Sequence, residues 1–296
     1  MNRRTFLAAS AGSLLAGPAL ADTKKPKIKK AVKYGMVGPG KTVREKFDLL
    51  KKLGFDGVEI DSPSGLNLAE ANEAQKATGV KIHGVIDSVH WSPMYTLSHP
   101  DPQVRAKGLE ALLGAVKDAE TVGADTVLLV PGQVREETVN GKKEMVTYEQ
   151  CYERSQAEVK KAIPAAEKAK VKIAIEVVWN NFITRPEQLV QYVDDFKSEW
   201  VGAYYDCSNT LRYGVPSADW IRKLGKRMVK FDFKGFSKAK QFNVKIGEGD
   251  EDWPEVLKAL GEIGYDGWAT SEVQRGDEAF LRDVAERMDK VLGLKA

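Results

Sequence analysis

Short apolar runs alternate with amphipathic stretches of helical length along most of the chain. The clearest run covers residues 172–178, is apolar at nearly every position, and contains one acid, Glu176. A strand that is buried on both faces of a parallel sheet has this composition. The alternation therefore predicts a succession of β/α units around parallel strands.

Eight strand–helix units can be placed in order, with no inserted domain between them. The predicted strands are 32–37, a second ending near Ile60, 80–86, 126–130, one ending at Glu176, 202–206, 228–234 and 268–273. Eight such units predict an α/β protein that is a single (β/α)8 TIM barrel. A doubly wound open sheet is the alternative. No glycine-rich phosphate loop follows the first strand, and this disfavours the open sheet.

A turn with one recurring pattern supports the repeated architecture. Leu53-Gly54-Phe55-Asp56-Gly57 is echoed by Ile263-Gly264-Tyr265-Asp266-Gly267, and a weaker copy lies at 122–127. In each copy a glycine follows the end of a predicted helix, where it can take the left-handed conformation that ends helices. The repetition favours β/α units of one kind.

The first residues have the features of an export signal. Arg3-Arg4-Thr5-Phe6-Leu7 is typical of a twin-arginine signal, an apolar run follows, and Ala19-Leu20-Ala21 fits a cleavage site. We therefore expect a signal peptide at 1–21, a basic linker at 22–31 and the barrel at 32–296, with a periplasmic or exported mature protein. A cytosolic chain with a chance arginine pair is the alternative.

The amino-acid composition limits the kinds of partner that we expect for this protein. The chain has 296 residues, is 43% hydrophobic and 29% charged, and carries a formal net charge of +3. Its basic residues are scattered and form no stripe, so we expect no nucleic-acid partner. The mature part contains no apolar run long enough for a stable membrane span. Cys151 and Cys207 are expected to be free, buried thiols, although an exported location would permit a disulfide.

Four acids lie at or near the carboxyl ends of the last four predicted strands: Glu176, Asp206, Asp232 and Glu272. All strand ends of a barrel meet at one rim, so these carboxylates should converge. A single buried acid could simply pair with a lysine or arginine, but four at one rim predict a divalent-metal site. Carboxylates favour Mn²⁺ or Mg²⁺, with Co²⁺ as a further candidate, whereas Zn²⁺ usually takes histidine or cysteine ligands.

A cation among carboxylates suits proton transfer at a carbon next to a carbonyl. The cation polarises the carbonyl group, and two carboxylates can remove and return the proton. An isomerase, an epimerase and a β-eliminating lyase all begin with this step.

Several segments together resemble one family. Glu176-Val177-Val178-Trp179-Asn180, Tyr205-Asp206-Cys207-Ser208-Asn209, 230–236, Gly247-Glu248-Gly249-Asp250 with Trp253, and Tyr265-Asp266-Gly267-Trp268 with Glu272 are similar to the xylose isomerase-like TIM barrel superfamily. Within it the chain resembles sugar phosphate isomerases/epimerases of the hexulose-6-phosphate isomerase-like and ketose 3-epimerase-like kinds. The resemblance implies one metal held by Glu176, Asp206, Asp232 and Glu272, and it implies that Glu176 and Glu272 form the acid/base pair.

The chain departs from that family on the seventh strand. Asp232-Phe233-Lys234-Gly235 stands where relatives usually have His-x-Lys-Asp. An added carboxylate should favour a hard cation over zinc. The alternatives are that Asp232 does not reach the metal, or that the catalytic function has changed.

Five further residues are predicted to face the substrate. These are His90, Trp91, Asn180, Asn209 and Lys234. The alternatives are a loop histidine with a packed tryptophan at 90–91, amides that support the metal ligands, and a lysine that offsets carboxylate charge.

We therefore expect a metal-dependent isomerase or epimerase of a sugar or keto-sugar, which is unphosphorylated if the protein is exported. A lyase of 3-keto sugars or glycosides, or a catalytically altered periplasmic sugar-binding protein, is the alternative. An apurinic-site endonuclease is disfavoured because its zinc cluster is rich in histidine and the chain has three. A homo-oligomer is left open.

Overall fold

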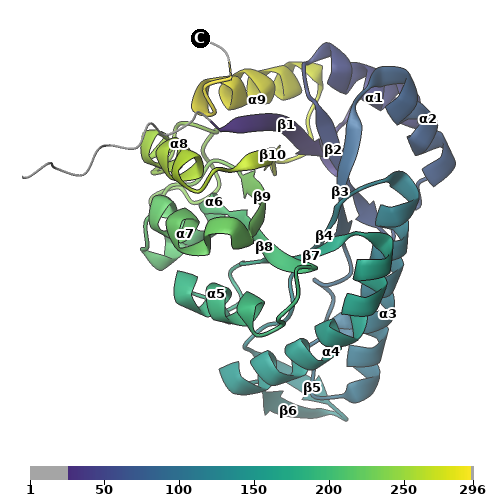
Figure 1. The fold of residues 1–296 in the computed structure, drawn as a ribbon, viewed down its shortest axis with the longest axis vertical. Helices are drawn as coiled ribbons and strands as arrows, with labels where there is room; N and C mark the ends of the chain where they lie inside the picture. Colours follow the sequence, from purple (N-terminus) through teal and green to yellow (C-terminus); the bar gives the residue numbers. More distant parts are fainter. Residues whose placement is uncertain (1–25, 295–296) are drawn as a thin grey trace, which may run out of the picture.

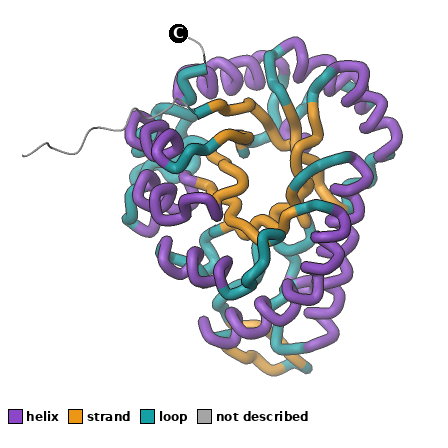
Figure 2. Tube along the Cα trace, in the orientation of Figure 1, coloured by secondary structure: helices purple, strands orange, loops and turns teal. Residues whose placement is uncertain are grey.

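The strands form one closed, parallel barrel in a computed structural model that describes residues 26–294. Helices surround the ring of strands (Figure 1), and colouring by secondary structure separates the two layers (Figure 2). The barrel strands are β1 (Lys27–Lys33), β2 (Gly57–Ser62), β3 (Lys81–Asp87), β4 (Thr126–Leu129), β7 (Lys172–Glu176), β8 (Val201–Asp206), β9 (Met228–Phe233) and β10 (Asp266–Ser271). Closure of the ring confirms the single (β/α)8 barrel and excludes the open sheet.

Helices follow the barrel strands, as the repeated β/α units predicted. They are α1 (Val43–Lys52), α2 (Leu68–Thr78), α3 (Pro102–Val122), α4 (Tyr148–Ala169), α5 (Pro186–Asp194), α6 (Cys207–Thr210), α7 (Ser217–Leu224), α8 (Trp253–Glu262) and α9 (Glu278–Val291). A hairpin of β5 (Glu136–Val139) and β6 (Lys142–Met145) projects at the edge of the molecule beyond α4 (Figure 1). It lies between β4 and α4 in the chain and outside the eight barrel strands.

The recurring glycine turn has the predicted geometry in all three copies. Gly54, Gly123 and Gly264 have φ values of +77°, +72° and +69°. Residues with side chains rarely adopt this left-handed conformation, whereas glycine adopts it at little cost. The same local rule therefore ends α1, α3 and α8 and returns the chain to the next strand.

The first strand begins earlier than the sequence pattern indicated. β1 starts at Lys27, so the barrel includes residues that were expected to belong to the linker at 22–31. The start of this strand could not be recognised in the sequence, because the lysines of 24–30 interrupt any apolar run. Lys30 is nevertheless 2% exposed, and its Nζ lies 2.6 Å from Asp289 Oδ1 on α9. The expected signal peptide at 1–21 lies outside the described residues.

The carboxyl end of β7 carries an acid next to the buried core. Ile173 and Ile175 are fully buried, and the next residue, Glu176, ends the strand.

Cys151 and Cys207 are free and buried, as expected. No helix within residues 26–294 is long and apolar enough to cross a membrane.

Candidate active site

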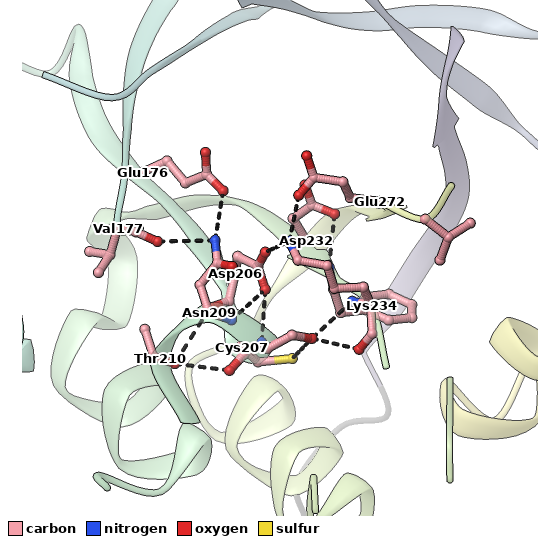
Figure 3. A network of polar contacts seen from close by, with 12 residues as sticks. Glu176, Val177, Asp206, Cys207, Asn209, Thr210, Asp232, Lys234 and Glu272 are labelled. Carbon is pink, nitrogen blue, oxygen red and sulfur yellow. Dashed lines mark hydrogen bonds and ion pairs between the residues drawn. The ribbon is translucent and has the colours of Figure 1, made fainter. Parts of the chain in front are cut away.

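The four acids converge at the carboxyl ends of four adjacent strands. Each of Glu176, Asp206, Asp232 and Glu272 offers a carboxylate oxygen, and these oxygens lie within 4.8 Å of one another. The strands β7, β8, β9 and β10 are consecutive neighbours in the barrel, and Asp206 is directly paired with Asp232 in the sheet register. Glu176 and Glu272 therefore come from the two ends of this run of strands, with the aspartates between them (Figure 3).

Backbone N–H groups hold one oxygen of each aspartate. Asp206 caps α6, where its Oδ1 accepts a hydrogen bond from Ser208 N at 2.7 Å. Asp232 Oδ1 accepts from Phe233 N at 2.8 Å. Both side chains are fully buried. The backbone thus fixes their orientation and leaves their second oxygens to face the cluster.

Asn209 holds Glu176 in a similar way. Its Nδ2 donates to Glu176 Oε1 and to the Val177 carbonyl oxygen, both at 3.2 Å (Figure 3). Asn209 was predicted to face the substrate, with support of a ligand as the alternative. The contacts favour support, because an amide engaged on both acceptors orients the carboxylate.

Two lysines lie against the carboxylate cluster. Lys234 Nζ is 2.6 Å from Asp206 Oδ2 and 2.5 Å from Glu272 Oε2. Lys33 Nζ, from the end of β1, is 3.0 Å from Asp232 Oδ2 and 3.1 Å from Glu272 Oε1. Lys234 therefore offsets carboxylate charge, which was the alternative to binding a substrate oxygen.

The two glutamates differ in their affinity for a proton. Burial, reinforced by the nearby charges of Glu272 and Asp206, raises the pKa of Glu176 well above its ordinary value despite the opposing effect of Lys33. Burial also acts to raise the pKa of Glu272, but Lys33 and Lys234 outweigh it and lower the pKa to about 2. Such a split between two facing carboxyl groups distinguishes an acid from a base.

The donor set fits one divalent cation. Two oxygen atoms on opposite sides of one cation, each about 2.0–2.6 Å from it, lie about 4.0–5.2 Å apart, so oxygen atoms within 4.8 Å of one another have a spacing typical of one ligand set. Asp232 Oδ2 is buried and accepts no hydrogen bond from the described part of the chain, although it lies in ion-pair range of Lys33. Glu176, Asp206, Asp232 and Glu272 are thus the residues that would hold a metal.

His90 and Trp91 lie in the loop after β3, where they were predicted. His90 is buried, its Nδ1 accepts from Val130 N at 3.3 Å, and its Nε2 has no hydrogen-bond partner among the described residues. Burial, with a contribution from Lys33, lowers the pKa of His90 to about 3. The ring is therefore neutral and carries its proton on Nε2. Trp91 is 57% exposed and lines the pocket above the carboxylates.

Asn180 also lines this pocket, but its side chain is engaged by the backbone. Its Nδ2 donates to the Gly132 carbonyl oxygen at 2.6 Å, and its Oδ1 accepts from Phe182 N at 3.1 Å. These contacts join the loops after β4 and β7. The side chain predicted to bind substrate therefore holds the pocket wall in place.

Three residues of the site escaped the sequence interpretation: Lys33, Arg135 and Phe242. Arg135 and Phe242 line a pocket of about 610 Å³ that contains Glu176 and Glu272. Arg135 lies just before β5, in a stretch without an apolar run, and Lys33 ends β1, whose end was predicted at residue 37. The 38% exposure of Phe242 follows from the fold, so no local pattern could have indicated it.

The chain matches a family model over most of its length. Residues 47–291 match the model described as "Xylose isomerase-like TIM barrel". The chain belongs to the xylose isomerase-like TIM barrel family. This confirms the resemblance seen in the motifs around Glu176, Asp206 and Glu272.

The relatives of this xylose isomerase-like barrel include sugar epimerases. L-ribulose-5-phosphate 3-epimerase UlaE of Escherichia coli K12 is 27% identical over 266 residues, which cover 83% of the chain and 90% of UlaE. Among solved structures, 3-keto-D-glucoside 4-epimerase YcjR from E. coli has a TM-score of 0.74 at 15% identity, covering 90% of this chain and 99% of YcjR. The IOLI protein with a bound zinc atom has a TM-score of 0.73 at 17% identity, covering 90% and 99%. The two structures show that the fold is shared.

Loading the site with a cation should raise the thermal stability. A ligand present at one hundred times its Kd stabilises the folded state by about 2.7 kcal/mol, and each kcal/mol raises the Tm of a domain of this size by about 2–4 °C. We expect millimolar Mn²⁺ to raise the Tm of chelator-treated protein by about 5–10 °C in circular dichroism. Asp206→Asn should abolish most of this shift. Equal Tm values with Mn²⁺, Mg²⁺, Co²⁺, Zn²⁺ and chelator would contradict the metal site.

Proposed function

We propose that this protein is a metal-dependent sugar epimerase that acts by proton transfer at a carbon next to a carbonyl group. The observation that carries the proposal is the placement of Glu176 and Glu272 at opposite ends of a four-carboxylate cluster. UlaE and YcjR, which are named as epimerases, support the same reaction class.

Each glutamate has a defined part in the reaction. Glu272 is the carboxylate that removes the proton, because the two lysines keep it ionised. Glu176 is placed to return a proton from the other side of the substrate, because it lies at the opposite end of the cluster from Glu272. Removal on one face and return on the other inverts the carbon centre. Asn209 holds Glu176 in place for this transfer.

A divalent cation bound by the four carboxylates would polarise the carbonyl group and stabilise the negative charge that develops on its oxygen. We propose Mn²⁺ or Mg²⁺, because all four candidate ligands supply oxygen. The zinc atom in the IOLI structure belongs to a protein of the same fold and keeps zinc among the ions to be tested.

The pocket supports an unphosphorylated substrate. The cations that line its described part, Arg135 and Lys234, are already paired with acids. Arg135 binds both oxygens of Glu137, at 2.8 and 3.2 Å, and Lys234 binds the carboxylate cluster. A phosphate group there would compete with Glu137 and with the carboxylate cluster for these cations. An exported location, which we propose from the signal-like residues 1–21, agrees with such a substrate.

Two exposed aromatic rings line the pocket. Trp91 follows β3 and Phe242 follows β9, and these strands are diametrically opposite in the barrel order. Aromatic rings supply apolar area and flat faces to ligands. We propose that they contact the part of a keto-sugar glycoside that extends beyond the reacting ring, as the name of YcjR also suggests.

Solvent-deuterium exchange tests the reaction directly. Purified protein with Mn²⁺ is incubated in D₂O with unphosphorylated ketoses and 3-keto-glucosides, and the products are examined by NMR and mass spectrometry. One deuterium at the carbon next to the carbonyl, with an inverted centre, is the expected result. Release of the aglycone would identify the lyase, and binding without exchange would identify a sugar-binding protein.

The proposed contact of Trp91 with the substrate leads to a separate prediction. Trp91→Ala should raise the KM for a reactive 3-keto-glucoside by about tenfold and change kcat little, since Trp91 lies away from the acids. Met94→Ala is a matched control, because Met94 is another exposed apolar side chain of the same loop and does not line the pocket. Steady-state kinetics on both variants decide the point, and an unchanged KM in Trp91→Ala contradicts it.

A further inference from the structure

Lys33 occupies a defined position beside the carboxylate cluster. It ends β1, whose register with β10 pairs Val32 with Ser271, and this places Lys33 next to Glu272. Its side chain is 12% exposed and lies 3.0 Å from Asp232 Oδ2 and 3.1 Å from Glu272 Oε1. The ammonium group therefore bridges two of the four acids.

The two lysines make equivalent contacts with the acids. Lys234 bridges Asp206 and Glu272, and Lys33 bridges Asp232 and Glu272, so that each oxygen of Glu272 faces one ammonium group. The other oxygens of both aspartates are held by backbone N–H groups. Each aspartate thus has one anchored oxygen and one oxygen directed at a lysine.

The charges of this arrangement sum to a simple value. With all four carboxylates ionised, as ligands of a cation are, and both ammonium groups charged, the side chains of the cluster carry a net charge of −2. One divalent cation neutralises that charge. Without Lys33 the cluster would carry −3, and with a neutral ligand in place of Asp232 it would carry −1. Lys33 therefore supplies one positive charge that offsets the negative charge of Asp232.

We propose that Lys33 is the built-in counter-ion of Asp232, and that this pair sets the affinity and selectivity of the centre for one hard divalent cation. The inference rests on the proposed metal-dependent function and adds a positioning residue to it. An ammonium group at this position repels a bound cation, yet it stabilises the buried acids when no cation is bound. The pair thus lowers the affinity for the metal and raises the stability of the metal-free protein.

A double-mutant cycle with Mn²⁺ tests the pairing. Lys33→Met should bind Mn²⁺ on the order of tenfold to hundredfold more tightly in calorimetry, because a positive charge in contact with two of the ligand carboxylates is removed. The same variant should have a lower Tm in chelator. Asp232→Asn should bind Mn²⁺ at least about tenfold more weakly. In the double variant the Tm in chelator should recover, so the two single effects should not add.

Two controls test whether the effect depends on the positive charge at position 33 and whether it is specific to a lysine at the site. Lys33→Arg retains the positive charge and should keep the Mn²⁺ affinity close to that of the unmodified protein. Lys27→Met removes an exposed lysine of the same strand and should combine additively with Asp232→Asn. Because affinity and Tm are measured without substrate, neither depends on the reaction.

The outcomes distinguish this inference from the proposed function. If the unmodified protein binds Mn²⁺ and catalyses exchange, but Lys33→Met binds Mn²⁺ with unchanged or lower affinity, only the role of Lys33 is overturned. Additive effects in the cycle overturn it as well. If the unmodified protein binds none of the divalent cations, both the metal-dependent function and the role of Lys33 are overturned.

Discussion

The Glu176→Gln variant is expected to lose solvent-deuterium exchange by about 10²–10⁴-fold, the usual contribution of a positioned acid or base. Glutamine has nearly the same shape and can stay beside Asn209, but it cannot carry the transferred proton. The loss should appear in kcat. Exchange followed by NMR in D₂O, at saturating Mn²⁺ and substrate, measures it.

A matched control for this experiment lies in the loop after β9. Glu248 is 53% exposed and pairs with Arg287 outside the carboxylate cluster. Glu248→Gln should therefore exchange at the rate of the unmodified protein. Circular dichroism and Mn²⁺ titration of Glu176→Gln separate lost proton transfer from lost folding or metal. A folded, metal-loaded Glu176→Gln protein with undiminished exchange would show that Glu176 is not the proton donor.

Lys30→Met is expected to lower the free energy of unfolding by about 3 kcal/mol. Lys30 Nζ is buried between the Ala285 carbonyl oxygen at 3.2 Å and Asp289 Oδ1 at 2.6 Å, and so joins β1 to α9. Removing one partner of a buried ion pair costs about 3–5 kcal/mol, because the remaining charge stays in a poorly solvated place. Urea unfolding followed by circular dichroism measures the change.

Lys27→Met provides the comparison on the same strand. Lys27 is exposed, and substitutions of exposed residues usually change stability by less than about 0.5 kcal/mol. Equal stability of Lys30→Met and the unmodified protein would mean that residues 27–31 act as the linker that the sequence suggested, and that α9 does not need β1 for its position.

The architecture and the main acids could be predicted from the sequence because both depend on local patterns. A buried parallel strand is a continuous apolar run, and a helix end is marked by a glycine such as Gly54 or Gly264. Each acid of the cluster follows such a run. Since a parallel barrel brings all carboxyl ends of its strands to one rim, the topology turned four separate local signals into one predicted site.

The start of the barrel could not be predicted, because β1 is stabilised by partners far away in the chain. Ile28 and Ala31 are buried among lysines, and Lys30 is neutralised by Asp289, which lies 259 residues later. A basic stretch is ordinarily exposed. The ion pair that makes burial of this lysine favourable exists only after α9 packs against β1.

The amino-acid sequence by itself determined the repeated β/α units, the eight strands and the four acids at the rim, because each is recorded in neighbouring residues. Only the tertiary structure decided which groups surround those acids. It brought Lys33 from the first strand to Asp232 and Glu272 at the end of the barrel, placed Asn209 against Glu176, and brought Trp91 and Phe242 to one pocket. These pairings arise when the ring of strands closes, and closure joins residues whose separation along the chain carries no local pattern.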